Sequence, residues 1–518
     1  MIANLPAVRE SAISKFTQEE LKKAGQDVLN LMNLSGVDSD RATHYNTKEE
    51  LAKARKDLHK AVFDFDRTLY GCLFCLPGVI DFSMQKAVTA LLGQPRNGET
   101  TILDADQESK IIEYMINTIQ PNKTLNMFVD FKGHRINNAR SRRMALTFIL
   151  NSKNLELWSV KYRTKLATIL QHMWGTKITG ALRNILVRKD PSVWDTSDNN
   201  FIEKYIGSYC SNKSSAIQCV SFILGRRQGL TAPLLRAFEE SKSDIAKGSK
   251  LPLEVLEGIA TTYHKNVKKA DLLTLVKSNL TAKQTRLVQN TAKKAGVKVK
   301  FDPKTQPMVE LYIYAFKMGM TNEIKSALKT KAQVASRGIP VRYGKIAILV
   351  DISKSMVGSE TQPLRPMAVA LATRDVLAYS GSKSIAITTS GTQTDIGTLI
   401  HPSGDTSLAE GLISLLESEP DAVFIISDGY ENTPAGRLSE TLTLVRQIGC
   451  NTPIYHINPV AAAESGQGVR VLDNRIPVMP INKPEQLSLA MFKAALTSDP
   501  SKGLLALMNR VLPLIESK

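Results

Sequence analysis

The side chains that could do chemistry gather at the end of one short apolar run. This run begins at Ile346 and ends in Asp351, and Ser353 and Ser355 follow at alternate positions. A buried parallel strand has such a continuous apolar run, and ligands bind where its carboxyl end opens into a loop. Small oxygen-bearing side chains on one loop can hold a hard divalent cation, and Mg²⁺ prefers octahedral oxygen coordination with few carboxylates. Asp-x-Ser-x-Ser is by itself a weak signal for a metal site, so the residues and elements around it must decide whether it is one.

Two later positions could complete such a site. Thr406 lies on a loop that leads into a helical pattern, and Asp428 ends the apolar run that begins at Ala422. From residue 336 to 518, strand-like and helical patterns alternate. The strand-like segments are 345–351, 384–389, 422–428 and 453–457, and the helical ones are 365–379, 407–416, 437–448 and the residues from 485 onward. This alternation predicts an α/β doubly wound domain, with a parallel sheet and helices on both faces.

Residues 1–335 have a different pattern, in which helix follows helix and strand-like alternation is scarce. Helical spacing covers residues 47–61, 142–150, 161–174, 200–224, 232–240, 253–263, 268–278 and 308–318. A long run of helices in pairs without a strict period predicts an all-α solenoid of HEAT type. An irregular helical domain is the competing interpretation. The segment 329–343 mixes Lys, Arg, Gly and Pro, which predicts a domain boundary near residue 335.

The charge is distributed unevenly along the chain. The 518 residues carry a formal net charge of +18, and 43% hydrophobic and 22% charged residues are ordinary values for a globular protein of several domains. From Gly344 onward there are 14 Lys and Arg against 17 Asp and Glu, a net charge of −3. The preceding part therefore carries +21. This asymmetry favours a polyanionic partner, above all nucleic acid, although a basic surface without a dedicated ligand is the alternative.

The cysteines and the hydropathy pattern exclude several classes of protein. Five cysteines are an odd number and too sparse for a disulfide framework. Cys72 and Cys75 form a C-x-x-C with apolar flanks and no second pair of that spacing, which favours buried free thiols over a zinc site. No apolar run approaches the length of a membrane span, and the N-terminus lacks a secretory pattern. We therefore expect a cytoplasmic protein without membrane contact.

Three stretches before residue 280 combine basic residues with aromatic or glycine positions. Their basic residues are Arg140, Arg142 and Arg143 in the first stretch, Arg226, Arg227 and Arg236 in the second, and His264, Lys265, Lys268 and Lys269 in the third. Lysine and arginine suit phosphate oxygens, and aromatic or guanidinium planes suit unstacked bases. Each stretch alone is typical of a solvated helix face. Their joint occurrence in the positively charged part favours RNA binding.

The candidate metal ligands also match a known pattern. Asp-x-Ser-x-Ser, a later loop Thr and a later strand-end Asp, in that order on alternating β and α elements, resemble the von Willebrand factor A fold. The family's metal-ion-dependent adhesion site corresponds here to Asp351, Ser353, Ser355, Thr406 and Asp428. The resemblance implies Mg²⁺ contacted directly by the hydroxyl groups, with the aspartates acting directly or through water. It also implies an open position that accepts a carboxylate from a partner protein.

Helical repeats followed by such a domain resemble the Ro ring proteins, the TROVE-domain family of RNA-binding proteins. Segments 43–51, 225–238 and 260–277 look like three family motifs, in the family's order. The resemblance implies a monomeric ring closed by the A domain. It would bind single-stranded ends of misfolded RNA in its hole and small non-coding, Y-like RNA outside, as a scaffold in RNA quality control or processing. By position, the resemblance adds Lys277 to the RNA-binding candidates, with Lys265 in the contacting segment.

Two other functions remain open. The first is a protein-interaction adaptor whose metal site grips an acidic residue, with a ribonuclease or another protein as the candidate partner. The second is catalysis, because residues 62–69 resemble the signature of haloacid-dehalogenase-type phosphatases, with Asp64 as nucleophile and Asp66 as general acid. That chemistry needs Asp64 at the end of a buried strand, whereas a charged helical pattern precedes it. We therefore expect no enzyme activity, and the chain has neither a P-loop nor a His-Glu-x-x-His motif.

Overall fold

The computed structural model of the chain describes residues 12–35, 48–96, 98, 100–294, 296–297, 299, 301–339, 343–360, 362–431, 434–460, 470–488, 496 and 499–516. The chain divides into two compact units. Unit 1 comprises residues 1–87, 98–115 and 303–518, and unit 2 comprises residues 88–97 and 116–302. Unit 1 thus combines helices from the N-terminal part with the α/β segment. The predicted domain boundary near residue 335 stays a prediction.

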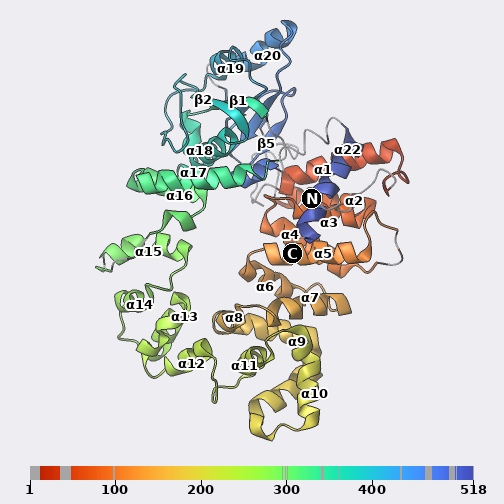
Figure 1. Cartoon of the computed structure of the whole chain (residues 1–518), viewed down its shortest axis with the longest axis vertical. Helices are drawn as coiled ribbons and strands as arrows, with labels where there is room; N and C mark the ends of the chain where they lie inside the picture. The colour runs from red at the N-terminus through yellow and green to blue at the C-terminus, as the bar shows by residue number, and fades with distance from the viewer. Residues whose placement is uncertain are drawn as a thin grey trace. The chain divides into compact units, whose positions relative to one another are not determined.

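Unit 1 contains a parallel sheet of five strands (Figure 1). The strands are β1 (Tyr343–Val350), β2 (Gly381–Thr388), β3 (Ala422–Ile426), β4 (Ile454–Asn458) and β5 (Val478–Pro480). Their order is β2-β1-β3-β4-β5, and every neighbouring pair is parallel. The four strands predicted from apolar runs are confirmed. The three-residue β5 is absent from the prediction because so short a segment has no readable alternation.

Helices cover both faces of this sheet. They are α18 (Arg365–Ala378), α19 (Leu408–Leu416) and α20 (Arg437–Gln447). Ala347 and Leu349 of β1 form one apolar cluster with side chains of β3, α19 and α20. The intervening residues Ile346 and Ile348 are also buried, and they face the other side of the sheet because side chains of a strand alternate. Helix α18 contacts β1 and β2. The predicted α/β organisation of this segment is confirmed.

The other helices of unit 1 come from both ends of the chain. They are α1 (Gln18–Ser35), α2 (Lys48–Phe65), α3 (Arg67–Cys75), most of α4 (Asp81–Gly93) and α5 (Ala105–Thr118), α16 (Met308–Met318), α17 (Asn322–Ser336) and α22 (Pro500–Glu516). Helix α22 packs against α1 and α3 (Figure 1). The amide of Gln486 donates a hydrogen bond of 3.0 Å to the carbonyl of Gly78. Helices α16 and α17 both pack against α18.

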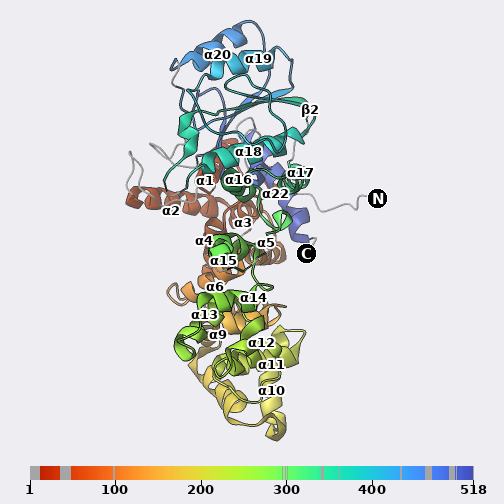
Figure 2. The same cartoon turned by 90° about the vertical axis from the view of Figure 1, so that its left-hand side faces the viewer.

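Unit 2 is helical in its described residues, as predicted (Figure 2). It contains α6 (Pro121–Asp130), α7 (Ala139–Leu150), α8 (Leu155–Lys161), α9 (Arg163–Arg183), α10 (Thr196–Tyr205), α11 (Lys213–Leu224), α12 (Pro233–Glu240), α13 (Leu253–Tyr263), α14 (Lys269–Val276) and α15 (Ala282–Lys294). The prediction of one helix over 200–224 is wrong. The chain breaks there because the Asn212 side chain accepts a hydrogen bond from the Ser215 N–H and starts a new helix.

Some expectations fall on other parts of the chain. Residues 43–47 of the first family-like motif, and most of 489–498 in the predicted C-terminal helices, lie outside the described residues. Closure of the helices into a ring stays a prediction. Among the helices that the structure describes, none is both long and apolar enough to cross a membrane.

Candidate functional site

Asp351 lies directly after β1 and is buried completely. Its Oδ1 accepts a hydrogen bond of 2.8 Å from the Ser353 N–H, and its Oδ2 accepts one of 2.7 Å from the Ser427 hydroxyl. Burial nevertheless raises the pKa of this carboxyl to about 6, with a smaller contribution from the charge of Asp428. A cation beside Asp351 would favour the charged form and offset that burial.

The two serines of the motif contact each other. The hydroxyl oxygens of Ser353 and Ser355 are 2.9 Å apart, and Ser353 is buried while Ser355 is exposed. The intervening Lys354 N–H donates a hydrogen bond of 3.2 Å to the carbonyl of Gly404. That bond holds the motif against the loop that carries Thr406. Two segments that are about fifty residues apart in sequence are therefore adjacent at this end of the sheet.

Thr406 provides the best test of whether a metal fits. Its side chain is fully buried, and its hydroxyl has no hydrogen-bond partner among the described residues. A buried hydroxyl without a partner costs free energy, and native proteins rarely leave one in that state. A divalent cation held by the neighbouring oxygens would supply the partner that this hydroxyl lacks. The residues present therefore fit Mg²⁺.

Asp428 follows β3, the strand that pairs with β1. It is 5% exposed, and its Oδ1 accepts a hydrogen bond of 3.1 Å from the Tyr430 N–H. The side-chain amide of Asn458, at the end of β4, donates a hydrogen bond of 3.1 Å to the Asp428 carbonyl and so holds the loop that follows β3. Ser427 and Asn458 are supporting residues that the sequence analysis missed. The only sequence signal for Ser427 is its place between the apolar run and Asp428.

The five predicted ligands thus lie on loops at the carboxyl ends of two adjacent strands and on the loop before α19. They offer three hydroxyls and two carboxylates, which are hard oxygen ligands suited to Mg²⁺. Across the described parts of the chain, no group of three or more His, Cys, Asp or Glu could hold a metal ion. The buried ring of His456 lies beside the site, with its Nε2 2.9 Å from the Ser427 carbonyl.

The phosphatase interpretation of Asp64 and Asp66 is contradicted by the fold. Asp64 lies within α2, not at the end of a strand. Asp66 caps α3, where its Oδ1 accepts hydrogen bonds of 2.9 Å from the N–H groups of Thr68 and Leu69. Its Oδ2 accepts one of 2.8 Å from the Ile102 N–H. The motif is therefore a helix start, and its carboxylates do not converge on a phosphate site.

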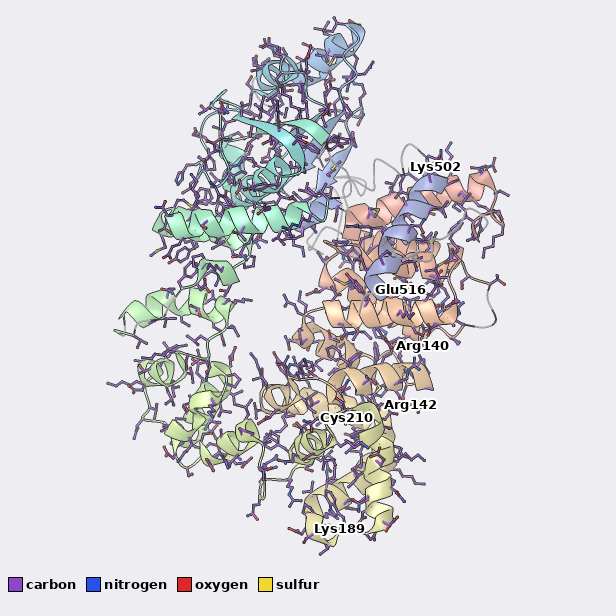
Figure 3. The ribbon with its side chains drawn as sticks, in the orientation of Figure 1. Arg140, Arg142, Lys189, Cys210, Lys502 and Glu516 are labelled. Carbon is purple, nitrogen blue, oxygen red and sulfur yellow. The ribbon has the colours of Figure 1, made fainter. Side chains whose placement is uncertain are left out.

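The predicted RNA-binding residues all lie in unit 2. Arg142 and Arg143 are exposed on α7, and neither has an ion-pair or hydrogen-bond partner in the described structure. Arg140 precedes Arg142 on the same helix (Figure 3). Lys265, Lys268, Lys269 and Lys277 are exposed around α14, and Lys269 pairs with Glu257 at 3.0 Å. His264 ends α13, with its Nε2 2.7 Å from the Ser241 carbonyl. Tyr263 beside it is 55% exposed.

The arginines of the second basic stretch have hydrogen-bond and ion-pair partners within unit 2. The Arg226 guanidinium donates hydrogen bonds to the carbonyls of Gln228, Leu186 and Lys189. Arg227 donates to two further carbonyls, pairs with Glu239 at 3.4 Å and lies 4.9 Å from the Phe222 ring centroid. Arg236 pairs with Glu240 at 3.8 Å and remains 60% exposed. Arg226 and Arg227 therefore hold unit 2 together in this structure.

The charge asymmetry becomes sharper when it is counted by unit. Unit 2 contains 33 Lys and Arg against 13 Asp and Glu, a net charge of +20. Unit 1 contains 34 against 36, a net charge of −2. The N-terminal residues that belong to unit 1, 1–87 and 98–115, contain 13 Lys and Arg against 17 Asp and Glu, a net charge of −4. The whole positive excess therefore lies in unit 2.

Comparisons with known proteins add little to this geometry. No protein-family model and no curated protein matches the chain. Among solved structures, the chain is similar to the crystal structure of the Ro (RSR) protein of Deinococcus radiodurans, at 14% identity and a TM-score of 0.36. The similarity covers 90% of this chain and 99% of that one. A TM-score this low supports neither a fold nor a function.

Proposed function

We propose that the protein binds RNA through unit 2. The observation that carries this proposal is the confinement of the positive charge: unit 2 carries +20 and unit 1 carries −2, which together give the total of +18. Lysine and arginine on such a surface neutralise phosphates and release counterions, which drives association with a nucleic acid.

The surface also offers the chemistry that distinguishes RNA from a general polyanion. Tyr263 is 55% exposed, and the exposed residues Lys265 and Lys268 follow it in the segment between α13 and α14. An exposed aromatic ring can stack on an unpaired base while nearby lysines contact its phosphates. Single-stranded RNA ends and loops are therefore the favoured targets over a continuous duplex.

The resemblance to the Ro ring family refines this proposal. On that basis the targets are small non-coding, Y-like RNA and single-stranded ends of misfolded RNA. The protein would act as a cytoplasmic scaffold in RNA quality control or processing and not as an enzyme, with the helical repeats closed into a monomeric ring.

Fluorescence anisotropy at graded salt tests RNA binding. The probe is an RNA hairpin with a single-stranded 3′ tail, compared with the blunt hairpin and with heparin. Lys265→Gln should weaken binding of the tailed hairpin and lower the salt slope by about 1. Lys383→Gln, an exposed residue of β2 in unit 1, is the control and should change neither quantity. Equal affinity for heparin and the tailed RNA would sink the proposal.

A second function, binding of an acidic protein partner, is favoured by the unpartnered hydroxyl of Thr406. We propose that Asp351, Ser353, Ser355, Thr406 and Asp428 hold Mg²⁺, and that the ion contributes one open position for a carboxylate of another protein, such as a ribonuclease. Asp351→Ala should abolish that interaction and leave RNA affinity unchanged. Loss of RNA binding in Asp351→Ala protein that remains folded would contradict this division.

A further inference from the structure

A cavity of about 340 Å³ lies within unit 1, away from the metal site. Its walls come from α17, the second half of α18, the edge strand β2 and residues 393–396 after that strand. Small-molecule sites are concave and of this order of size, with a few convergent polar groups. No sequence pattern marks this cavity, because its walls come from four segments between Lys325 and Ile396.

One of the lining residues is a buried cation, Arg374, whose side chain is 1% exposed. Its Nε and Nη2 bond to Asp375 Oδ1 at 3.0 and 2.7 Å, and its Nη2 also bonds to the Tyr312 hydroxyl at 3.0 Å. Its Nη1 donates 2.7 Å to the Thr394 hydroxyl. Nη1 carries two hydrogens, and Thr394 is its one acceptor within the described residues. One N–H of a rigidly held guanidinium is therefore left for a ligand.

Two lysines of α17 also line the cavity and carry the same positive charge as Arg374. Lys325 and Lys329 lie one turn apart on α17, and neither forms an ion pair or hydrogen bond in the part of the chain that the structure describes. Like charges at this spacing destabilise a helix. The stem of Lys325 is held against Gly397, where an added Cβ would lie 2.8 Å from Lys325 Cγ. Two lysines without an acidic partner at a cavity can bind an anionic ligand.

The remaining walls offer more than an anion site. Tyr379 contributes an aromatic side chain, Ser384 and Gln393 contribute hydroxyl and amide groups, and Asp395 contributes an exposed carboxylate. An aromatic face suits a base, and a carboxylate accepts hydrogen bonds from sugar hydroxyls or an exocyclic amine. A bare anion would use none of these groups and would be repelled by Asp395.

We propose that this cavity binds a mononucleotide. The phosphate lies between Lys325, Lys329 and the free N–H of Arg374, and the nucleoside lies along Tyr379 and Asp395. Because the cavity belongs to unit 1, it is separate from the RNA surface proposed on unit 2, and either proposal can fail without the other.

Calorimetric titration of the full chain with 5′-AMP, adenosine and inorganic phosphate tests the site. We expect saturable binding of one AMP, and affinities at least about tenfold weaker for adenosine and for phosphate, since each lacks half of the contacts. The double variant K325Q/K329Q should lose about tenfold or more in AMP affinity. Lys331→Gln removes a lysine of the same helix outside the cavity and serves as the control, which should bind AMP as the wild type does.

Three outcomes would overturn the proposal. They are no saturable AMP binding at millimolar concentration, an unchanged AMP affinity in the double variant, and phosphate binding as tight as that of AMP. The lysine variants keep the buried Arg374 network intact, so their circular dichroism spectra should match the wild type and exclude misfolding as the cause of a loss.

Discussion

The hydroxyl of Tyr312 donates a hydrogen bond of 2.5 Å to Asp375 Oδ2 in the interior of unit 1. Tyr312 lies on α16 and Asp375 on α18, so the bond joins the end of the all-helical segment to a helix that packs on the sheet. Arg374 completes the group by contacting both side chains. Burial raises the pKa of Tyr312 well above its ordinary value, which favours the protonated hydroxyl that donates this bond.

Tyr312→Phe should therefore weaken the contact between α16 and α18. The change removes one donor and leaves Asp375 under-satisfied in the interior, which costs about 1–3 kcal/mol. Hydrogen-exchange mass spectrometry should show faster exchange in α16 and α18. Tyr263→Phe removes an exposed hydroxyl and serves as the control, with no expected change. Unchanged exchange in the Tyr312 variant would mean that the packing of the helices, not the network, holds them together.

Removal of the Thr406 hydroxyl should separate metal binding from folding. Thr406→Val keeps the shape of the side chain and deletes a buried hydroxyl that has no partner in the described structure. The metal-free variant should be as stable as the wild type or slightly more stable. Mg²⁺ at about 100 times its Kd should stabilise the wild type by about 2.7 kcal/mol and the variant much less.

Thermal unfolding with Mg²⁺ or with EDTA measures this difference. Thr373→Val is the matched control, because that buried hydroxyl has a partner, the Val369 carbonyl at 2.7 Å, and lies outside the site. Its Mg²⁺ response should equal that of the wild type. An undiminished Mg²⁺ response in Thr406→Val would remove Thr406 from the metal site.

Arg226 and Arg142 should give opposite results, although both lie in basic stretches of unit 2. Arg226→Gln removes hydrogen bonds to the Leu186 and Lys189 carbonyls and should destabilise unit 2 by about 1–3 kcal/mol. Arg142→Gln should leave stability unchanged and weaken RNA binding. Tryptophan fluorescence during urea unfolding reports unit 2 specifically, because Trp158, Trp174 and Trp194 are the three tryptophans of the chain. If the Arg226→Gln protein were as stable as the wild type but had lost RNA affinity, Arg226 would be an RNA-binding residue and not a stabilising one.

His59 should make unit 1 sensitive to acid. The ring is 2.8 Å from the Tyr70 hydroxyl and stacks on Phe74, and burial, aided by Arg55 and Lys86, lowers the pKa of His59 to about 4. The unfolded chain has a His pKa near 6.5. The stability that this neutral ring supports is therefore fully present above about pH 6.5 and is lost as the pH falls towards 4, by at most about 1.4 kcal/mol per pH unit.

Urea unfolding of unit 1 between pH 7 and pH 4.5, followed by circular dichroism, checks this sign. His59→Gln keeps a polar side chain near Tyr70 but does not titrate, so its stability should fall less steeply with acid than that of the wild type. Parallel pH profiles for the two proteins would show that other groups dominate the acid response.

The sequence by itself determined the features that depend on local pattern. Four strands were predicted from strand-like segments. Two of these segments are continuous apolar runs of the kind that buried parallel strands have, and they end at Asp351 and near Asp428, so the loops that carry these two candidate ligands were predicted as well. Composition likewise determined the positive charge of the helical segment. The same rules found several helices of unit 2 but not α6, α8 or α15. They also missed the break at Asn212, because a cap depends on one hydrogen bond and not on apolar spacing.

Only the tertiary structure decided which of these groups have partners. Arg142 and Arg226 occupy similar basic stretches, yet the partners of Arg226 are carbonyls about 40 residues away in sequence. Helix α22 packs on α1 and α3, from the opposite end of the chain, and the cavity beside Arg374 needs four separate segments. The unpartnered hydroxyl of Thr406 is likewise invisible in sequence. These properties arise from contacts between distant residues, which periodicity and propensity within a segment do not specify.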